Sequence, residues 1–318
     1  MCGVDPIRSG PRSEEPSMGL SHDLRALLIQ KTAPLTVRYG EQHRYSGTDL
    51  APPTSLRIPT RHGRVRCDVY RPAGTDPLPP AYVHFHGGAF LMRYPKMDDF
   101  FARIVAAEVG AVVLNVDYDV APQKRFPVAQ EQCHDVSAWV AAHPEELDVD
   151  GDRVAIGGFS AGGNLAASAA LQARDRESFS PACQLLGAPS LDIAGDPAAK
   201  TATIPNPMIG PGLLRMVRAT YFRDVDARSS PYASPLLADT LAGVAPGIVV
   251  TAEHDLLRAE GDAYAARMRA DGVPVQHHVV PGADHYFLEN GPGGARRTLD
   301  LIVSGLRSHL YSKVFPAD

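Results

Sequence analysis

The sequence predicts an α/β protein with a mostly parallel central sheet and helices on both of its faces. Short apolar runs rich in β-branched residues alternate with helical patterns over most of the chain, and this order is typical of parallel sheets. The 318 residues are 44% hydrophobic and 21% charged, as in a globular domain with a sizeable core. A disordered or collagen-like chain is excluded.

Strands are expected where short apolar runs are bounded by turn residues. The alternating pattern at 65–72 predicts a half-exposed strand, whereas the other runs are continuous and predict buried strands. The buried runs are 81–85, 111–118, 153–159, 183–189, 247–252 and 275–280. Segment 31–59 is interrupted by prolines, so no regular element is predicted there.

Helices are expected where apolar residues recur three or four positions apart. A short amphipathic pattern at 24–30 precedes the first strand. The patterns that alternate with the strands are 97–109, 128–142, 161–173, 256–270 and 295–309. Segment 192–230 breaks the alternation because it is rich in turn residues, and it holds one amphipathic helix near 212–221.

The chain is expected to form one α/β domain over 56–318 with a smaller cap upon it. Residues 1–20 are rich in Ser, Pro, Gly and charge, and they are predicted to be a flexible tail. Segments 21–55 and 192–228 lie outside the alternation and need a surface to pack on. A cap over the carboxyl ends of the strands is the simplest arrangement, because open α/β sheets place their sites at that edge.

Charge and cysteine content narrow the partners and the compartment. The 31 Lys and Arg residues against 36 Asp and Glu give a net charge of -5, which argues against nucleic acid as a partner. No apolar stretch approaches the ~18 residues of a membrane span, and no signal peptide precedes Glu14, so we expect no membrane span and a cytoplasmic protein. The four cysteines are far apart in sequence and are expected to be reduced thiols.

The strongest local signal is the G-F-S-A-G run at 158–162, which follows a predicted strand and opens a predicted helix. This is the context of a nucleophile elbow, in which small neighbours let the chain turn sharply at Ser160. The N-terminus of the following helix favours negative charge on a reacting oxygen. The alternative is an ordinary tight strand-to-helix turn, where glycines are also common.

A second signal is the H-G-G-A-F run at 86–90, directly after a predicted strand. It lacks the glycine spacing and the lysine of a phosphate-binding loop. If this loop lies beside Ser160, backbone amides can hold the oxyanion of a tetrahedral intermediate. The expected donors are Gly87, Gly88 and Ala161.

Other reactive side chains have a structural interpretation. His86 is expected to tie its loop down by hydrogen bonds rather than to carry a proton. His84 and His86 form an HxH pair, but no third ligand for a metal is evident. Cys133 lies in a helical pattern where sequence neighbours point apart, so a cysteine nucleophile is not expected.

A serine hydroxyl becomes a strong nucleophile only when a base takes its proton and an acid orients that base. Asp255 and His285 each follow a predicted strand, in the chain order nucleophile, acid, base. Both lie at the sheet edge where Ser160 emerges, so three loops can converge there. The alternatives are a helix N-cap role for Asp255, a polar loop role for His285, or replacement by their neighbours Glu253, His254 and Asp284.

With these residues assembled, residues 60–310 resemble the hormone-sensitive-lipase-like (bacterial family IV) carboxylesterases of the α/β-hydrolase superfamily. The family's HGGG, DYRLAPE, GDSAGG, NPxxSPL, DxLxD and HxF motifs are specific in combination. Their counterparts here are HGGA at 86–89, DYDVAP at 117–122, GFSAGG at 158–163, SPYASPL at 230–236 and the loops of Asp255 and His285. The resemblance implies the α/β-hydrolase fold with a helical cap.

The resemblance also implies catalytic roles for Ser160, Asp255 and His285, and hydrolysis of short to medium acyl esters without a cofactor or metal. The partner is then a small-molecule ester. Family members often dimerise through the last strand and helix, so a homodimer is one expectation. The sequence departs from the family at five positions outside the triad, which bear on rate and substrate choice: Ala89, Asp119, Gln123, Phe159 and Glu260.

The sequence therefore predicts a serine carboxylesterase that forms an acyl-enzyme on Ser160. One alternative keeps the triad and makes the protein a biosynthetic acyltransferase, a lactonase or an amide hydrolase. Another is a non-catalytic small-molecule receptor, because plant gibberellin receptors resemble this family while lacking a catalytic residue. Five residues are candidates either for the substrate pocket or for plain packing: Phe90, Phe159, Leu213, Met216 and Tyr221.

Overall fold

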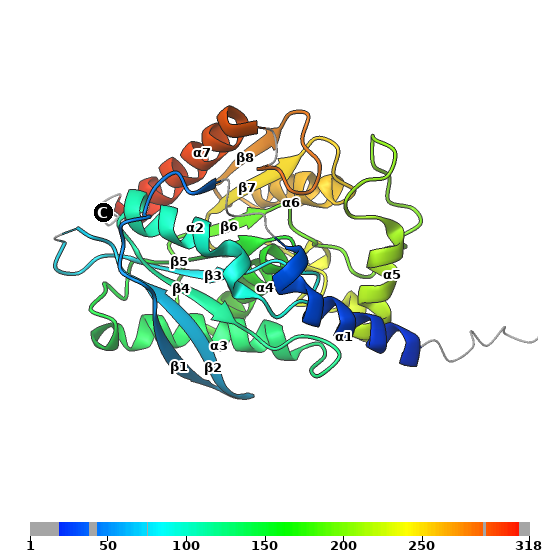
Figure 1. Ribbon diagram of the computed structural model, residues 1–318, viewed down its shortest axis with the longest axis horizontal. Coiled ribbons are helices and arrows are strands. Elements are labelled where there is room, and N and C mark those ends of the chain that lie inside the picture. The colour runs from blue at the N-terminus through cyan, green and yellow to red at the C-terminus, as the bar shows by residue number, and fades with distance from the viewer. Residues whose placement is uncertain (1–18, 38–42, 75, 289–290, 312–318) are drawn as a thin grey trace, which may run out of the picture.

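The computed structural model of the protein describes residues 19–37, 43–74, 76–288 and 291–311. An eight-stranded sheet with the order β1-β2-β4-β3-β5-β6-β7-β8 forms its centre (Figure 1). The strands are β1 (Thr54–Thr60), β2 (Gly63–Tyr70), β3 (Ala81–Phe85), β4 (Val112–Asp117), β5 (Val154–Phe159), β6 (Gln184–Gly187), β7 (Gly247–Ala252) and β8 (Val275–Val280). The predicted tail up to residue 18, with Cys2, lies outside the described residues.

The sheet is mostly parallel, as predicted. The strands from β4 to β8 in the sheet order pair in parallel, whereas β2 pairs antiparallel with both β1 and β4. β1 was not predicted, because Pro59 interrupts its apolar pattern. Pro59 pairs opposite Arg64 at the outer edge of the sheet, where a proline without an N–H group is tolerated.

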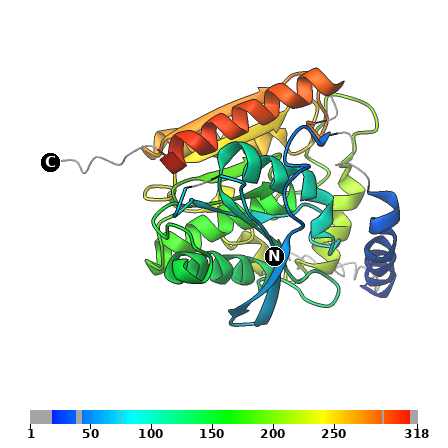
Figure 2. The same cartoon turned by 60° about the vertical axis from the view of Figure 1, so that its left-hand side comes forward.

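Two hydrophobic clusters fill the space between the sheet and its helices. One cluster contains residues of α3, α4 and α6, and the other contains residues of α2 and α7, so the helices cover both faces of the sheet (Figures 1 and 2). The bounds of these helices are α2 (Asp99–Ile104), α3 (Val128–Ala142), α4 (Ala161–Arg176), α6 (Arg258–Ala270) and α7 (Gly291–Tyr311). Each contains or overlaps a predicted helix.

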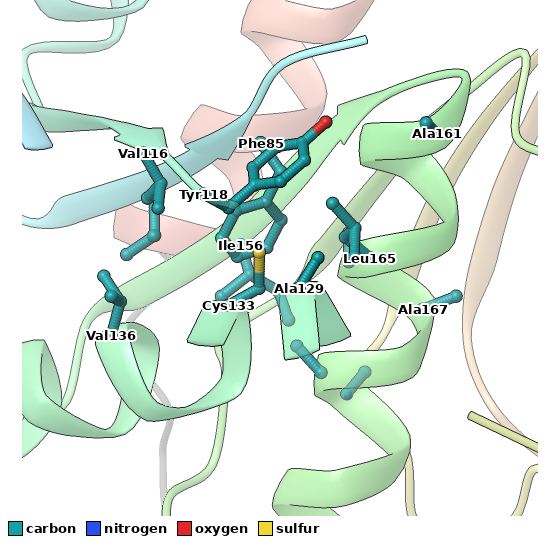
Figure 3. Close-up of a cluster of buried hydrophobic side chains, with 14 of the residues drawn as sticks. Phe85, Val116, Tyr118, Ala129, Cys133, Val136, Ile156, Ala161, Leu165 and Ala167 are labelled. Atoms are coloured by element: carbon teal, nitrogen blue, oxygen red, sulfur yellow. The ribbon is translucent and has the colours of Figure 1, made fainter. Parts of the chain in front are cut away.

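The first cluster shows why Cys133 is not a nucleophile. Its side chain lies between α3, α4 and the sheet, close to Ile156 and Leu165 (Figure 3). Burial raises the pKa of the Cys133 thiol well above its ordinary value, so the thiolate does not form near neutral pH. Cys67 and Cys183 are likewise buried free thiols.

Two further helices, α1 (Gly19–Thr36) and α5 (Pro211–Thr220), lie side by side at one end of the molecule (Figures 1 and 2). The side chains of Gln30 and Gln123 exchange hydrogen bonds of 2.9 Å, which fasten α1 to the loop after β4. Asp23 of α1 also pairs with Arg125 and Arg223. In the part of the chain that the structure describes, no helix is both long and apolar enough to cross a membrane.

Candidate active site

Ser160 occupies the turn between β5 and α4. Its backbone angles, φ 57° and ψ -115°, are rarely adopted by L-residues, and such a conformation costs about 1–3 kcal/mol. The N–H group of Ser160 donates to the carbonyl of Gly187 at 2.8 Å, which holds the turn against β6. A Cβ atom at Gly158 or Gly162 would collide with the carbonyl oxygen of Phe85, so the elbow requires glycine at both positions.

Asp255 and His285 meet although they follow different strands. His285 Nδ1 lies 2.9 Å from Asp255 Oδ2, and Asp255 Oδ1 accepts the N–H of Leu257 at 3.0 Å. The two residues are only 3% and 8% exposed. Because the carboxylate accepts at Nδ1, the imidazole carries its hydrogen there and keeps Nε2 free to take a proton. Asp255 thus also holds the backbone at Leu257, just before α6, but it is not the N-cap of that helix, because α6 begins at Arg258 and Leu257 is its N-cap.

The neighbours of these two residues have other partners. Glu253 accepts the N–H of Gly282 at 2.6 Å, and His254 Nδ1 lies 2.6 Å from the hydroxyl of Thr203. Asp284 accepts the backbone N–H groups of His285 and Met208 through its two oxygens, each at 2.7 Å. These contacts hold loops together, so none of the three rivals forms the acid–base pair.

The glycine loop after β3 lies against the serine elbow. A Cβ atom at Gly87 would lie 3.3 Å from the carbonyl oxygen of Phe159 and 3.8 Å from Ser160 Cβ. Gly88 has φ 113°, and a Cβ atom there would come within 2.8 Å of Met92 Cβ. A side chain at Gly87 would crowd the serine elbow, and one at Gly88 would collide with Met92, so glycine at both positions suits the path of this loop.

His86 fixes this loop from below. Its Nδ1 atom lies 2.6 Å from the carbonyl of Gly87, and its ring stacks on Tyr118 with centroids 4.3 Å apart. The Tyr118 hydroxyl donates to the His86 carbonyl at 2.7 Å. Burial lowers the pKa of His86, so the ring is neutral. The role predicted for His86, tying the loop down, matches these contacts.

Two cavities meet at Ser160. The larger has a volume of about 220 Å³, and its wall includes Gly87, Gly88, Ser160 and His285. The smaller has a volume of about 30 Å³ and also includes Ser160, together with Ala161, but not His285. Ser160 and His285 thus face the same space, as convergence of the three loops predicts.

Three of the five candidate pocket residues line these cavities. Phe159 lies on the wall of the larger cavity, Phe90 on that of the smaller, and Leu213 on both. Met216 and Tyr221 are on neither wall. Tyr221 is fully buried instead, with its hydroxyl bound to Gln130 Oε1 at 2.8 Å, because it packs between α5 and the main domain.

Phe159, where the family has aspartate, belongs to an aromatic group. Its ring lies edge-on to those of Phe101, Phe287 and His84, with centroid distances of 4.7, 5.5 and 5.4 Å. Edge-to-face packing of this kind is favourable for aromatic pairs. The substitution therefore places an apolar ring, and no carboxylate, under the serine.

Other departures from the family have partners of their own. The buried Glu260 carboxylate accepts the N–H groups of Leu191 and Asp192 at 2.6 and 2.7 Å and pairs with Lys200. It thereby anchors the start of the segment that leads to α5. Asp119 pairs with Arg93 at 3.0 Å, outside both cavities.

One pair near the site was missed by the sequence analysis. His84 Nε2 lies 2.9 Å from Asp98 Oδ2, both residues are buried, and Asp98 is on the wall of the larger cavity. The only sequence signal was the HxH pair, yet His84 and His86 have separate partners. Within the described residues, no group of three His, Cys, Asp or Glu side chains is arranged to hold a metal ion.

Comparisons with known proteins show the family of the chain. Residues 82–289 match the family described as alpha/beta hydrolase fold. Carboxylic ester hydrolase LipN of Mycobacterium tuberculosis is 35% identical over 81% of this chain and 70% of its own length. An arylesterase of Saccharolobus solfataricus is 33% identical over 72% of this chain and 74% of its own.

A solved structure gives the same result. The esterase of Pyrobaculum calidifontis superposes with a TM-score of 0.82 at 31% identity, covering 92% of this chain and 98% of its own. Sequence motifs, sheet order and relatives therefore agree. The chain belongs to the hormone-sensitive-lipase-like (bacterial family IV) carboxylic ester hydrolases of the α/β-hydrolase superfamily.

Proposed function

We propose that the chain hydrolyses small carboxylic esters with Ser160 as nucleophile, His285 as general base and acid, and Asp255 as the group that orients His285. One observation carries the proposal: His285, which pairs with the buried Asp255, lies on the wall of the same cavity as a serine held in a strained turn. Strain of this kind persists where it serves function, because the surrounding structure must compensate for it.

In the proposed mechanism, His285 Nε2 takes the Ser160 proton as the hydroxyl attacks the ester carbonyl. The Asp255 carboxylate stabilises the imidazolium that forms. His285 then gives its proton to the departing alcohol, which leaves an acyl group on Ser160. Water repeats the same steps and releases the acid.

The oxyanion of each tetrahedral intermediate is assigned to the amides of Gly87, Gly88 and Ala161. Support comes from the close approach of Gly87 to the elbow and from the place of Ala161 at the N-terminus of α4. Peptide dipoles add positive potential at a helix N-terminus. Removing one such donor typically lowers turnover by about 100- to 1000-fold.

The two cavities suggest where the alcohol part and the acyl part of an ester bind. His285 must face the leaving oxygen, and only the larger cavity includes His285, so we assign the alcohol part to it. The smaller cavity then receives the acyl chain, and its volume of about 30 Å³ favours the short end of the predicted short-to-medium range. The cap predicted for segments 21–55 and 192–228 is assigned to α1 and α5 beside this entrance, whereas Thr54 and Ser55 belong to β1 of the sheet.

Labelling and kinetics test the function together. A fluorophosphonate should modify Ser160, and 4-nitrophenyl acetate should give a burst of nitrophenol if deacylation is slow. Ser160→Ala should remove the label and reduce kcat/KM by about 10³-fold or more. Ser178→Ala is the matched control, because the Ser178 hydroxyl contacts His134, away from both cavities. Full activity in Ser160→Ala would refute the mechanism.

We also propose that two copies pair along β8. This strand ends the sheet, and in the described part of the chain it has a strand neighbour on one side only. Val279 of β8 and Leu301 of α7 are 39% and 44% exposed and share one surface hollow. Light scattering on the purified protein should give a dimer mass, and Val279→Arg should halve it. A monomer at micromolar concentration would contradict the pairing.

A further inference from the structure

The larger cavity has an apolar wall with one carboxylate in it. Met92, Met97 and Phe287 are typical of its side chains, and among the described residues on its wall Asp98 alone carries an acidic group. Asp98 is 4% exposed, and it is not on the wall of the smaller cavity at Ser160. A carboxylate in such surroundings is unfavourable unless it is paired and hydrogen-bonded.

His84 pairs with Asp98 from the protein side of the cavity wall. Its Nε2 atom lies 2.9 Å from Asp98 Oδ2, its Nδ1 atom lies 3.3 Å from the Tyr82 hydroxyl, and its ring is fully buried. The aromatic rings of Phe101 and Phe159 flank it at 5.2 and 5.4 Å. His84 is therefore fixed, and it holds Asp98 in one orientation.

This pairing leaves acceptor capacity on Asp98. An ionised carboxylate offers about four lone-pair sites, and His84 uses one of them. Asp98 is also the N-cap residue of α2, yet its side chain makes no capping hydrogen bond there. The remaining sites are available to a donor that enters the cavity.

The alcohol part of the ester is the group that brings a donor to Asp98. Under the proposed mechanism the leaving oxygen faces His285, and His285 shares the larger cavity with Asp98. The apolar wall suits a carbon skeleton, and the carboxylate suits one hydroxyl group upon it. A purely alkyl alcohol would leave the Asp98 lone pairs without a partner, because it displaces the water that would otherwise bind them.

We propose that Asp98 is a specificity-determining residue that accepts a hydrogen bond from a hydroxyl group on the alcohol part of the substrate. The favoured substrates are then short-chain monoesters of diols and other hydroxylated alcohols. This inference rests on the proposed esterase function and names the substrate class for the same site. His84 acts through Asp98 and is a positioning residue.

The test compares esters that differ by one hydroxyl. Alkyl acetates of two to six carbons are paired with the corresponding ω-hydroxyalkyl acetates, and the ratio of kcat/KM values is measured for each pair. The wild-type protein should favour the hydroxylated ester at one chain length by about 10- to 100-fold, the range for a hydrogen bond to a charged group. Asp98→Leu should bring that ratio to about one.

The ratio of the two kcat/KM values separates a change in specificity from a folding defect, because general damage to the site lowers both values together. Asp98→Asn, which keeps the shape and one acceptor oxygen, should give an intermediate ratio and covers the case in which Asp98→Leu does not fold. Asp99→Asn is the control, since Asp99 binds Tyr70 and Arg103 outside the cavity and should keep the wild-type ratio.

The outcomes distinguish this inference from the proposed function. Ratios near one at every chain length, with Ser160 labelled and plain acetates hydrolysed, would overturn the role of Asp98 and leave the esterase intact. A preference for trimethylammonioalkyl acetates over the hydroxyalkyl series would also overturn it, because those esters carry charge but no donor. Failure of Ser160 labelling and of all hydrolysis would instead contradict the esterase.

Discussion

The Nδ1 atom of His285 lies 2.9 Å from Oδ2 of Asp255, and the Asp255 side chain is fully buried. This contact decides which ring nitrogen of His285 can act as a base. With asparagine at 255, an amide N–H can face Nδ1 and stabilise the tautomer in which Nε2 already carries hydrogen. Asp255→Asn should therefore lower kcat by about 10³- to 10⁴-fold at neutral pH with little change in thermal stability.

Glu253→Gln provides the comparison for this prediction. Glu253 lies two residues earlier, and its carboxylate accepts the N–H of Gly282 at 2.6 Å, so the variant should keep most of the activity. Steady-state ester hydrolysis and the rate of fluorophosphonate labelling are measured for both. Equal losses in the two variants would mean that the loop, and not the orientation of His285, controls the rate.

The glycines of the elbow should be intolerant of any side chain. A Cβ atom at Gly162 would overlap the Phe85 carbonyl, which is fixed in β3, so the turn must distort or the helix must move. Gly162→Ala should destabilise the fold by about 4 kcal/mol or more in urea unfolding. Gly212→Ala, in a helix position with open space around it, should be neutral or stabilise by up to about 1 kcal/mol.

The regular elements, and the residues proposed as the triad, could be picked out from the sequence because their signals are local. The bounds predicted for the strand at 81–85 and the helix at 128–142 agree with those of β3 and α3. Asp255 and His285 could be picked out because each follows a strand whose carboxyl end must meet the Ser160 edge. The proximity of Asp255 and His285 depends on the order of the strands in the sheet, which is a property of the whole fold and not of a local pattern.

The features missed depend on contacts between distant segments. In the sequence, Asp98 is one polar residue in a helical pattern. Its position on the cavity wall depends on its packing beside His84. The interaction of Met208 with Asp284 joins a turn-rich segment without periodicity to a loop 76 positions away. β1 was missed since the tolerance of an edge strand for Pro59 cannot be read from a local pattern.

Acid stability should depend on the ion pair between Glu108 and Arg296. The Arg296 guanidinium donates to both Glu108 oxygens at 2.7 and 2.6 Å and, with the Ser46 hydroxyl, lowers the pKa of Glu108. A carboxyl whose pKa is lower in the folded state stabilises the fold above its unfolded pKa, about 4.3, and this stabilisation is lost as pH falls through the folded pKa.

Glu108→Gln should thus reduce the free energy of unfolding at pH 7 by about 0.5–1 kcal/mol, a value discounted because solvent reaches the pair. At pH 3 the difference from wild type should shrink. Urea unfolding at pH 7, 5 and 3 measures it, with the exposed Glu146→Gln as control. A difference that stays constant with pH would show that packing, and not charge, is lost.

Asp284 should control substrate binding through the segment that leads to α5. Its two oxygens accept the N–H groups of His285 and Met208, and Met208 and Ile209 line the larger cavity. Asp284→Ala removes the hydrogen bond that holds Met208 in this wall, while the contact of His285 with Asp255 still orients the imidazole. KM should therefore rise about 3- to 10-fold, with a smaller change in kcat.

Asp196→Ala separates this effect from general loosening of the segment. Asp196 accepts the N–H of Ala198 at 2.9 Å within the same stretch, but it does not reach the His285 loop. Its KM should stay near the wild-type value, and Asp284→Asn, which keeps one carbonyl acceptor, should fall between wild type and Asp284→Ala. If kcat fell in Asp284→Ala while KM stayed constant, Asp284 would act on the imidazole loop alone, since the cavity wall would then be held by other contacts.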